Sequence, residues 1–163
     1  MLSFDKRVVT AALKRLGMPY IWGGHGNVCW VLENSVAKIV PMQAHAGCPF
    51  GYDCAGLVTD AVLEAGGPDI RWKHNAQTLY DTLPIILSPI PDDNFLVFYG
   101  RPGHISHIAI GLGKDLIIEA AGGDQTTNTY ADALNRGATV RINYEHRLDR
   151  MGFRKLMDVQ DLT

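Results

Sequence analysis

Residues 52–58 read Tyr-Asp-Cys-Ala-Gly-Leu-Val, and they open the most regular helical pattern in the chain. The apolar side chains that follow recur at helical spacing on one stripe, made of Leu57, Val58, Ala61, Val62 and Ala65. The run Gly66-Gly67-Pro68 ends the pattern, because glycine and proline both terminate helices. The stretch therefore predicts a helix over 54–65 that begins at a cysteine and packs one face against a core.

The segments on either side of this helix predict an α+β fold. Residues 5–16 also show helical spacing, with Ser3 at the N-cap position and Gly17 at the stop, and residues 74–83 form a shorter candidate helix. Beyond residue 94 the apolar period changes, which predicts strands over 95–99, 105–112, 116–121, 138–144 and 150–157. Helices first and an antiparallel meander afterwards are typical of the α+β class.

Length and composition set the outer limits of this interpretation. A chain of 163 residues with 47% hydrophobic and 20% charged residues suits one folded domain over 1–163 and excludes wholesale disorder. The net charge of −2 gives no sign of a nucleic-acid partner. No apolar run reaches the roughly 18–20 residues of a membrane span, and residues 1–7 do not read as a secretory signal. We therefore expect a chain made in the cytoplasm, with no membrane span.

Residues 26–52 form an irregular region that we expect to be a loop insertion, which could hold a hairpin. It raises three alternatives for the cysteines in it. Together with two histidines, they could form a tetrahedral zinc site of His25, Cys29, His45 and Cys48. A Cys29–Cys48 disulfide is a second alternative, and two free thiols are the interpretation we prefer. We accordingly expect no metal and no cofactor.

Cys54 is the first candidate for chemistry, because it stands at the start of the predicted helix. Unpaired amide donors and the helix dipole favour an anion there, so we expect a lowered thiol pKa and a better nucleophile. The small residues Ala55 and Gly56 leave access to the sulfur. The alternative is a buried structural cysteine, which is a common role.

His107 is the candidate base for this thiol. Strict alternation along 105–112 places His107, Ala109 and Gly111 on one face of the strand. This face carries small residues, so we expect the helix to pack against it and bring Cys54 to the imidazole. His104 is a competitor, but it lies beside the turn at Gly103 and is expected to be exposed.

Glu119 is the candidate that would orient the histidine, since it is the only polar residue in the strand around it. Antiparallel pairing of 105–112 with 116–121 puts Glu119 on the face of His107, where a carboxylate can hold the ring tautomer. An exposed strand glutamate is the alternative. A cysteine at a helix start, then a histidine and a polar residue on successive strands, follows the linear order of papain-like enzymes.

Four motifs resemble the NlpC-type papain-like cysteine peptidases, which cut bacterial cell-wall peptides. They are Tyr20-Ile21-Trp22-Gly23-Gly24, residues 53–58, residues 96–99 and residues 106–113, in the order and spacing of that family. The resemblance runs from about Tyr20 to Ala120, and Gly152-Phe153-Arg154 is similar to the family's closing strand. The chain departs from the family at Ala55, usually serine, and at Glu119, often histidine.

The resemblance implies a function and a role for each matching residue. Cys54 would be the nucleophile, His107 the general base and Glu119 the third member of the triad. The residues implied to bind the oxyanion or the free amino group of the substrate are Tyr20, Asp53 and Ser106. The implied reaction hydrolyses an amide of the peptidoglycan stem peptide, between D-glutamate and diaminopimelate or lysine, through a thioacyl intermediate.

The cellular setting is an expectation from the same resemblance and the absence of a visible signal. We expect a monomer or a component of a phage particle that reaches the cell wall by phage delivery, lysis or specialised export. Two other functions stay open. One is cysteine-dependent acyl transfer or protein deamidation on the same fold, and the other is a non-catalytic virion or assembly protein.

Overall fold

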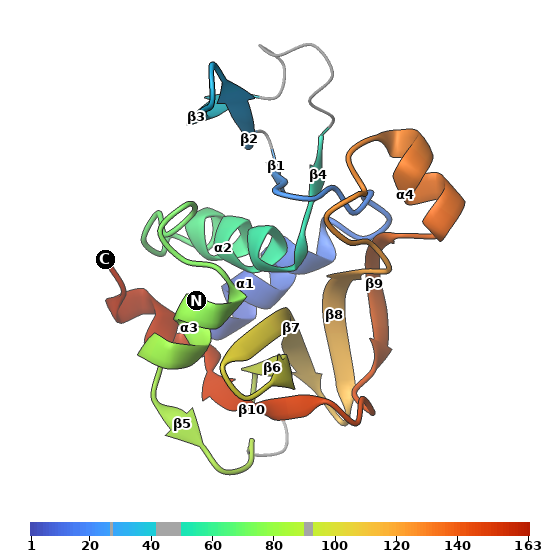
Figure 1. Ribbon diagram of the computed structural model, residues 1–163. Coiled ribbons are helices and arrows are strands. Elements are labelled where there is room, and N and C mark those ends of the chain that lie inside the picture. The colour runs from blue at the N-terminus through green and yellow to red at the C-terminus, as the bar shows by residue number, and fades with distance from the viewer. Residues whose placement is uncertain (27, 42–49, 90–92) are drawn as a thin grey trace.

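A computed structural model describes residues 1–26, 28–41, 50–89 and 93–163 of the protein, and a six-stranded antiparallel sheet runs through its centre (Figure 1). The strand order is β5-β10-β6-β7-β8-β9. The bounds are β5 (Ile85–Ile86), β6 (Phe95–Arg101), β7 (His104–Gly113), β8 (Leu116–Ala121), β9 (Thr139–Tyr144) and β10 (Arg150–Lys155). The expected antiparallel meander is confirmed, and every neighbouring pair in this sheet is antiparallel.

Helices cover one face of this sheet, which confirms the α+β class. The helices are α1 (Phe4–Leu13), α2 (Cys54–Glu64), α3 (Ala76–Thr82), α4 (Tyr130–Arg136) and the 3-10 helix η2 (Leu156–Asp161). The main core joins α1 and α2 to the sheet, through fully buried side chains such as Val8, Leu57, Val58, Ile108 and Ile110. The buried stripe of α2 is the one that its sequence spacing predicts.

A bulge between β6 and β7 decides which residues of β7 face the helices. Tyr99 pairs with His107, but the next residue of β6, Gly100, pairs with Ile105, so Ser106 is the extra residue on β7. An extra residue reverses the alternation of a strand. Ile105 therefore lies in the helix-covered core together with Ile108, while Ser106 is exposed.

The expected packing of the helix on the His107 face is wrong. Ala109, on the same face as His107, belongs to a second core cluster with Phe95, Val97, Tyr99 and Ile117, which contains no residue of α2. The Phe95 ring occupies the space above Gly111, where a side chain would otherwise stand. The small residues of this face therefore make room for aromatic rings, and α2 packs on the opposite face.

Residues 26–52 begin and end on a short strand pair. β1 (His25–Gly26) is antiparallel to β4 (Gly51–Tyr52), and the predicted hairpin is present as β2 (Val28–Glu33) and β3 (Val36–Pro41). Tyr20 forms a further bridge to Tyr52, which ties the first glycine-rich turn to the entry of α2. The role of this region as an insertion stays a prediction.

Other element boundaries differ from the sequence expectation by a few residues. Ser3 is the N-cap of α1, but its side chain forms no capping hydrogen bond. Helix α1 ends at Leu13 rather than at residue 16. β10 ends at Lys155, and the chain continues as η2 where the strand was expected to reach 157. In the part of the chain that the structure describes, no helix is long and apolar enough to cross a membrane.

Candidate active site

Asp53 fixes the start of α2 and thereby the position of Cys54. It is the N-cap, and its Oδ1 accepts a hydrogen bond of 2.6 Å from the Gly56 amide. Its Oδ2 accepts a second one of 3.1 Å from the Gly23 amide, so the carboxylate joins the glycine-rich turn to the helix. Burial raises the pKa of Asp53, against the opposing effects of His25 and of these amides. This capping role was not predicted, although an aspartate directly before a helix is a typical N-cap, and the substrate-binding role of Asp53 stays a prediction.

Gly56 explains how tightly the turn packs on the helix. A β-carbon at Gly56 would collide with the carbonyl oxygen of Gly24. The glycine therefore lets the backbone of residues 23–24 approach the first turn of α2, as glycine does wherever two backbones meet closely.

Cys54 lies at the first position of α2, as predicted, but the expectation of a lowered pKa is wrong. Burial first and the charge of Asp53 second raise the pKa of the thiol to about 12. The backbone amides of Ile108, Ala55 and Cys54 itself act in the opposite direction and do not compensate. Desolvation of a thiolate outweighs the helix N-terminus here, so the free thiol keeps its proton at neutral pH.

His107 and Glu119 form the pair that the strand register predicts. The Nε2 atom of His107 lies 2.7 Å from Oε2 of Glu119, and the Glu119 side chain is only about 4% exposed. Burial by itself raises the pKa of Glu119, but the bond to His107, the bond from Asn143 and the charge of Arg141 together hold it below its usual value. Glu119 is therefore a carboxylate that fixes one edge of the imidazole.

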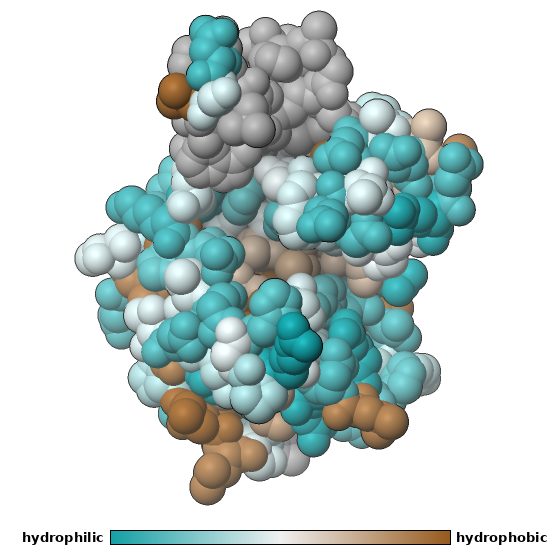
Figure 2. Space-filling model, viewed as in Figure 1, coloured by the Kyte–Doolittle hydropathy of each residue, from teal (hydrophilic) through white to brown (hydrophobic). Residues whose placement is uncertain are grey.

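A cleft of about 850 Å³ brings the predicted site residues together. Its lining includes Tyr20, Asp53, Cys54, Ser106 and His107. Because Glu119 engages Nε2 of His107, Nδ1 is the nitrogen left for the thiol, and the Ile108 amide beside His107 already reaches the sulfur. Figure 2 shows a hollow with a pale floor and a largely polar rim between the regions that Figure 1 labels α3 and α4.

Tyr20 is buried beside the thiol, and Gly123 makes room for it. Burial raises the pKa of Tyr20, and the neighbouring Cys54, Asp53 and Asp124 raise it further, so its hydroxyl is a neutral donor. A β-carbon at Gly123 would enter the Tyr20 ring. The run Gly122-Gly123-Asp124 predicts a turn, and only the packed structure shows that Gly123 also fits against the Tyr20 ring.

His25 belongs to the packing behind α2. Its Nδ1 lies 3.1 Å from the Thr59 hydroxyl, its ring packs on Trp72, and burial lowers its pKa. Among the described residues, no group of three or more histidine, cysteine or acidic side chains could hold a metal ion. The side chain of Cys29 and the whole of His45 and Cys48 lie outside the described residues, so the zinc and disulfide alternatives stay predictions.

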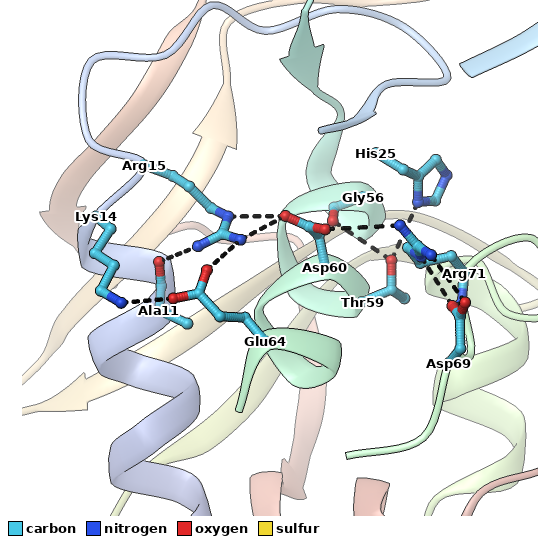
Figure 3. A network of polar contacts seen from close by, with 10 residues as sticks. All are labelled: Ala11, Lys14, Arg15, His25, Gly56, Thr59, Asp60, Glu64, Asp69 and Arg71. Carbon is cyan, nitrogen blue, oxygen red and sulfur yellow. Dashed lines mark hydrogen bonds and ion pairs between the residues drawn. The ribbon is translucent and has the colours of Figure 1, made fainter. Parts of the chain in front are cut away.

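A network of charged side chains anchors α2 from the side away from the cleft (Figure 3). Nε and Nη2 of Arg15, in the turn that follows α1, donate to Oδ2 of Asp60 at 2.9 and 2.6 Å. Arg15 also pairs with Glu64, and Arg71 lies 3.9 Å from the other oxygen of Asp60. These contacts connect α2 with α1 and with the segment that follows it.

Comparison with known proteins decides the family. The sequence model of the NlpC/P60 family matches residues 17–142, which is most of the chain. The chain belongs to the NlpC/P60 family. A protein of Mycobacterium tuberculosis named as a probable endopeptidase is 31% identical over 115 residues, which are 70% of this chain and 23% of that protein. The chain thus spans less than a quarter of the length of this curated relative.

Solved NlpC/P60 structures share the fold at low identity. RipB of M. tuberculosis, a peptidoglycan hydrolase, matches with a TM-score of 0.60 and 21% identity over 93% of this chain and 63% of that one. RipD of the same organism, described as a non-catalytic domain protein adapted to peptidoglycan binding, matches with a TM-score of 0.61 and 18% identity over 94% and 96%. The family therefore includes peptidoglycan hydrolases and at least one non-catalytic protein.

Proposed function

We propose that this protein is a cysteine peptidase that hydrolyses an amide bond in the stem peptide of peptidoglycan. The observation that carries the proposal is the buried His107–Glu119 pair, whose free imidazole nitrogen shares a cleft with the Cys54 thiol. A nucleophile, a base and a group that orients the base are the three parts that thioacyl chemistry requires.

The reaction proceeds with the proton of the thiol moving to Nδ1 of His107 as sulfur attacks the carbonyl carbon. The Tyr20 hydroxyl lies beside the sulfur and can donate to the oxygen that becomes negative. Collapse of this intermediate breaks the carbon–nitrogen bond, and the leaving amine takes the proton from His107. Water, deprotonated by His107, then cleaves the thioester and restores the thiol.

Asp53 and Ser106 are the groups in the cleft that would recognise the free amino group of a trimmed stem peptide. Asp53 supplies a carboxylate one residue before the nucleophile, and the bulge exposes the Ser106 hydroxyl one residue before the base. A cationic amine held by both would set the scissile amide at the sulfur. The bond we propose lies between D-glutamate and diaminopimelate or lysine.

A second candidate is peptidoglycan binding without hydrolysis. One observation favours it: the pKa of the Cys54 thiol is raised to about 12, so the free protein holds no preformed thiolate at neutral pH. Transfer of the proton to His107 during attack removes this obstacle, which is why we place hydrolysis first.

The test is digestion of purified sacculi and soluble stem peptides, with products identified by mass spectrometry. Wild-type protein should release new amino-terminal fragments, and Cys54→Ala should release none while still sedimenting with sacculi. If the wild-type protein sediments with sacculi but releases no fragments, hydrolysis is wrong and peptidoglycan binding without hydrolysis becomes the favoured function. The place where the protein acts and its delivery by a phage stay predictions.

A further inference from the structure

Tyr99 is the direct cross-strand neighbour of His107. The two residues face each other in the β6–β7 register, immediately before the bulge that exposes Ser106. Their ring centroids are 5.6 Å apart and their planes are tilted by 31°, so the tyrosine ring packs against the imidazole. Side chains in such a pair constrain each other directly.

Polar contacts at its edge and face hold the Tyr99 ring itself. The residue is fully buried, and its hydroxyl donates to Oε1 of Glu145 at 3.2 Å. The guanidinium of Arg147 lies over the ring at 4.5 Å from its centroid, and Asp149 holds that guanidinium through two hydrogen bonds. The loop between β9 and β10 thus holds the Tyr99 ring in its position against His107. This loop is distant in sequence from His107.

One hydrogen bond does not determine the plane of an imidazole. The bond from His107 Nε2 to Glu119 fixes one edge, but the ring can still rotate about an axis through that edge, which would turn Nδ1 away from the sulfur. Contact with the Tyr99 ring removes this freedom. We propose that Tyr99 is a positioning residue that holds His107 in the orientation needed to accept the Cys54 proton, an inference that rests on the proposed function.

The variants that test this separate the ring from its hydroxyl and from general packing. Tyr99→Leu removes the ring, and Tyr99→Phe keeps the ring while losing the bond to Glu145. Phe98→Leu is the matched control, because Phe98 is the next residue of β6, equally buried, and packs into the helix-covered core away from His107. Circular dichroism checks folding, and Tyr99→Met with Phe98→Met replace the leucine pair if either leucine variant does not fold.

The first readout is alkylation of Cys54 by iodoacetamide at pH 7, followed by peptide mapping. In this step the sulfur–carbon bond forms, iodide leaves and the thiol proton passes to His107, so the rate reports the base without any wall substrate. We expect the rate to fall about tenfold in Tyr99→Leu, as for a misaligned catalytic group, and to stay within about twofold in Tyr99→Phe and Phe98→Leu.

The second readout is the kinetics of stem-peptide hydrolysis. Tyr99→Leu should lower kcat by a similar factor with little change in KM, because the substrate does not touch Tyr99. Unchanged alkylation and kcat in Tyr99→Leu, or an equal loss in Phe98→Leu, would overturn the inference. Absence of hydrolysis by the wild type would overturn the proposed function alone, since the alkylation rates still decide the role of Tyr99.

Discussion

At the scale of single residues, Cys54 shows how burial can outweigh a helix terminus. The N-terminus of α2 favours an anion, yet loss of water around the sulfur raises the pKa of the thiol to about 12. In the mechanism we propose, the reactivity of this cysteine depends on His107, which accepts the proton as the sulfur attacks. Sequence position alone does not reveal this, because solvent exposure follows from how the whole cleft packs.

Removing the base gives a pH dependence that tests this account of Cys54. In His107→Ala the thiol can react only as a thiolate, and below its pKa the thiolate fraction grows with pH. The rate of Cys54 alkylation should therefore rise roughly tenfold per pH unit between pH 7 and pH 10, starting well below the wild type. The rate is measured by quenching the alkylation at set times and mapping the modified peptide. A rate that levels off below pH 9 would contradict the raised pKa of the thiol.

Glu119 permits a second test at this scale. Glu119→Gln keeps the shape of the side chain but removes the negative charge that stabilises a protonated His107. We expect kcat for stem-peptide hydrolysis to fall on the order of a hundredfold, within the range of general acid–base effects. Arg141→Gln is the comparison, since this side chain lies 3.8 Å from Glu119 on the outer side and should lower kcat far less. Full activity of Glu119→Gln would remove Glu119 from the triad.

At the scale of elements, α2 is the helix that begins with Cys54, and its anchoring to α1 is polar as well as apolar. Asp60 and Arg15 are both largely shielded from water, whereas Glu64 in the same network is more exposed. A shielded charge that loses its partner costs more than an exposed one, because water cannot replace the lost bonds.

We therefore expect Asp60 to contribute more to the stability of the fold than Glu64. Asp60→Asn should lower the free energy of unfolding by about 2 kcal/mol, since it removes the better shielded of the two carboxylates that pair with the Arg15 guanidinium. Glu64→Gln is the control within the same helix and should cost less than about 1 kcal/mol. Urea denaturation of both variants measures the difference. Equal losses in the two variants would mean that shielding of the Asp60–Arg15 pair does not matter.

The bulge in β7 marks the limit of sequence reasoning at this scale. The strands, their antiparallel order and the pairing of His107 with Glu119 follow from apolar patterns and a short turn at 113–115. Strict alternation cannot register an extra residue, so it does not predict that Ile105 enters the core while Ser106 is exposed. It does place His107 and Ile108 on opposite faces, and the expectation that α2 covers the His107 face failed because the small residues there make room for the Phe95 ring. Helix α4 was not predicted, because only one of its seven residues is buried and the segment therefore shows no apolar stripe at helical spacing.

At the scale of the whole molecule, segments far apart in the chain build one cleft around a rigid sheet. The glycine-rich turn supplies Tyr20, α2 supplies Cys54, β7 supplies Ser106 and His107, and the loop after β8 adds Gly123. The motifs and their order predict that Cys54, His107 and Glu119 come together, and the structure brings His107 to Glu119 and to the cleft that Cys54 lines. The close fits, such as Gly123 against the Tyr20 ring, depend on three-dimensional packing that a single sequence does not encode visibly.

We propose that Cys54, His107 and Glu119 act together to form an acyl-enzyme with a stem peptide. Intact-protein mass spectrometry after an acid quench of the protein mixed with a soluble stem peptide detects this intermediate. We expect a mass increase equal to the acyl portion of the peptide without its leaving amine, mapped to Cys54 and missing in His107→Ala. Cleavage that persists in Cys54→Ala, with no adduct on the wild type, would contradict it.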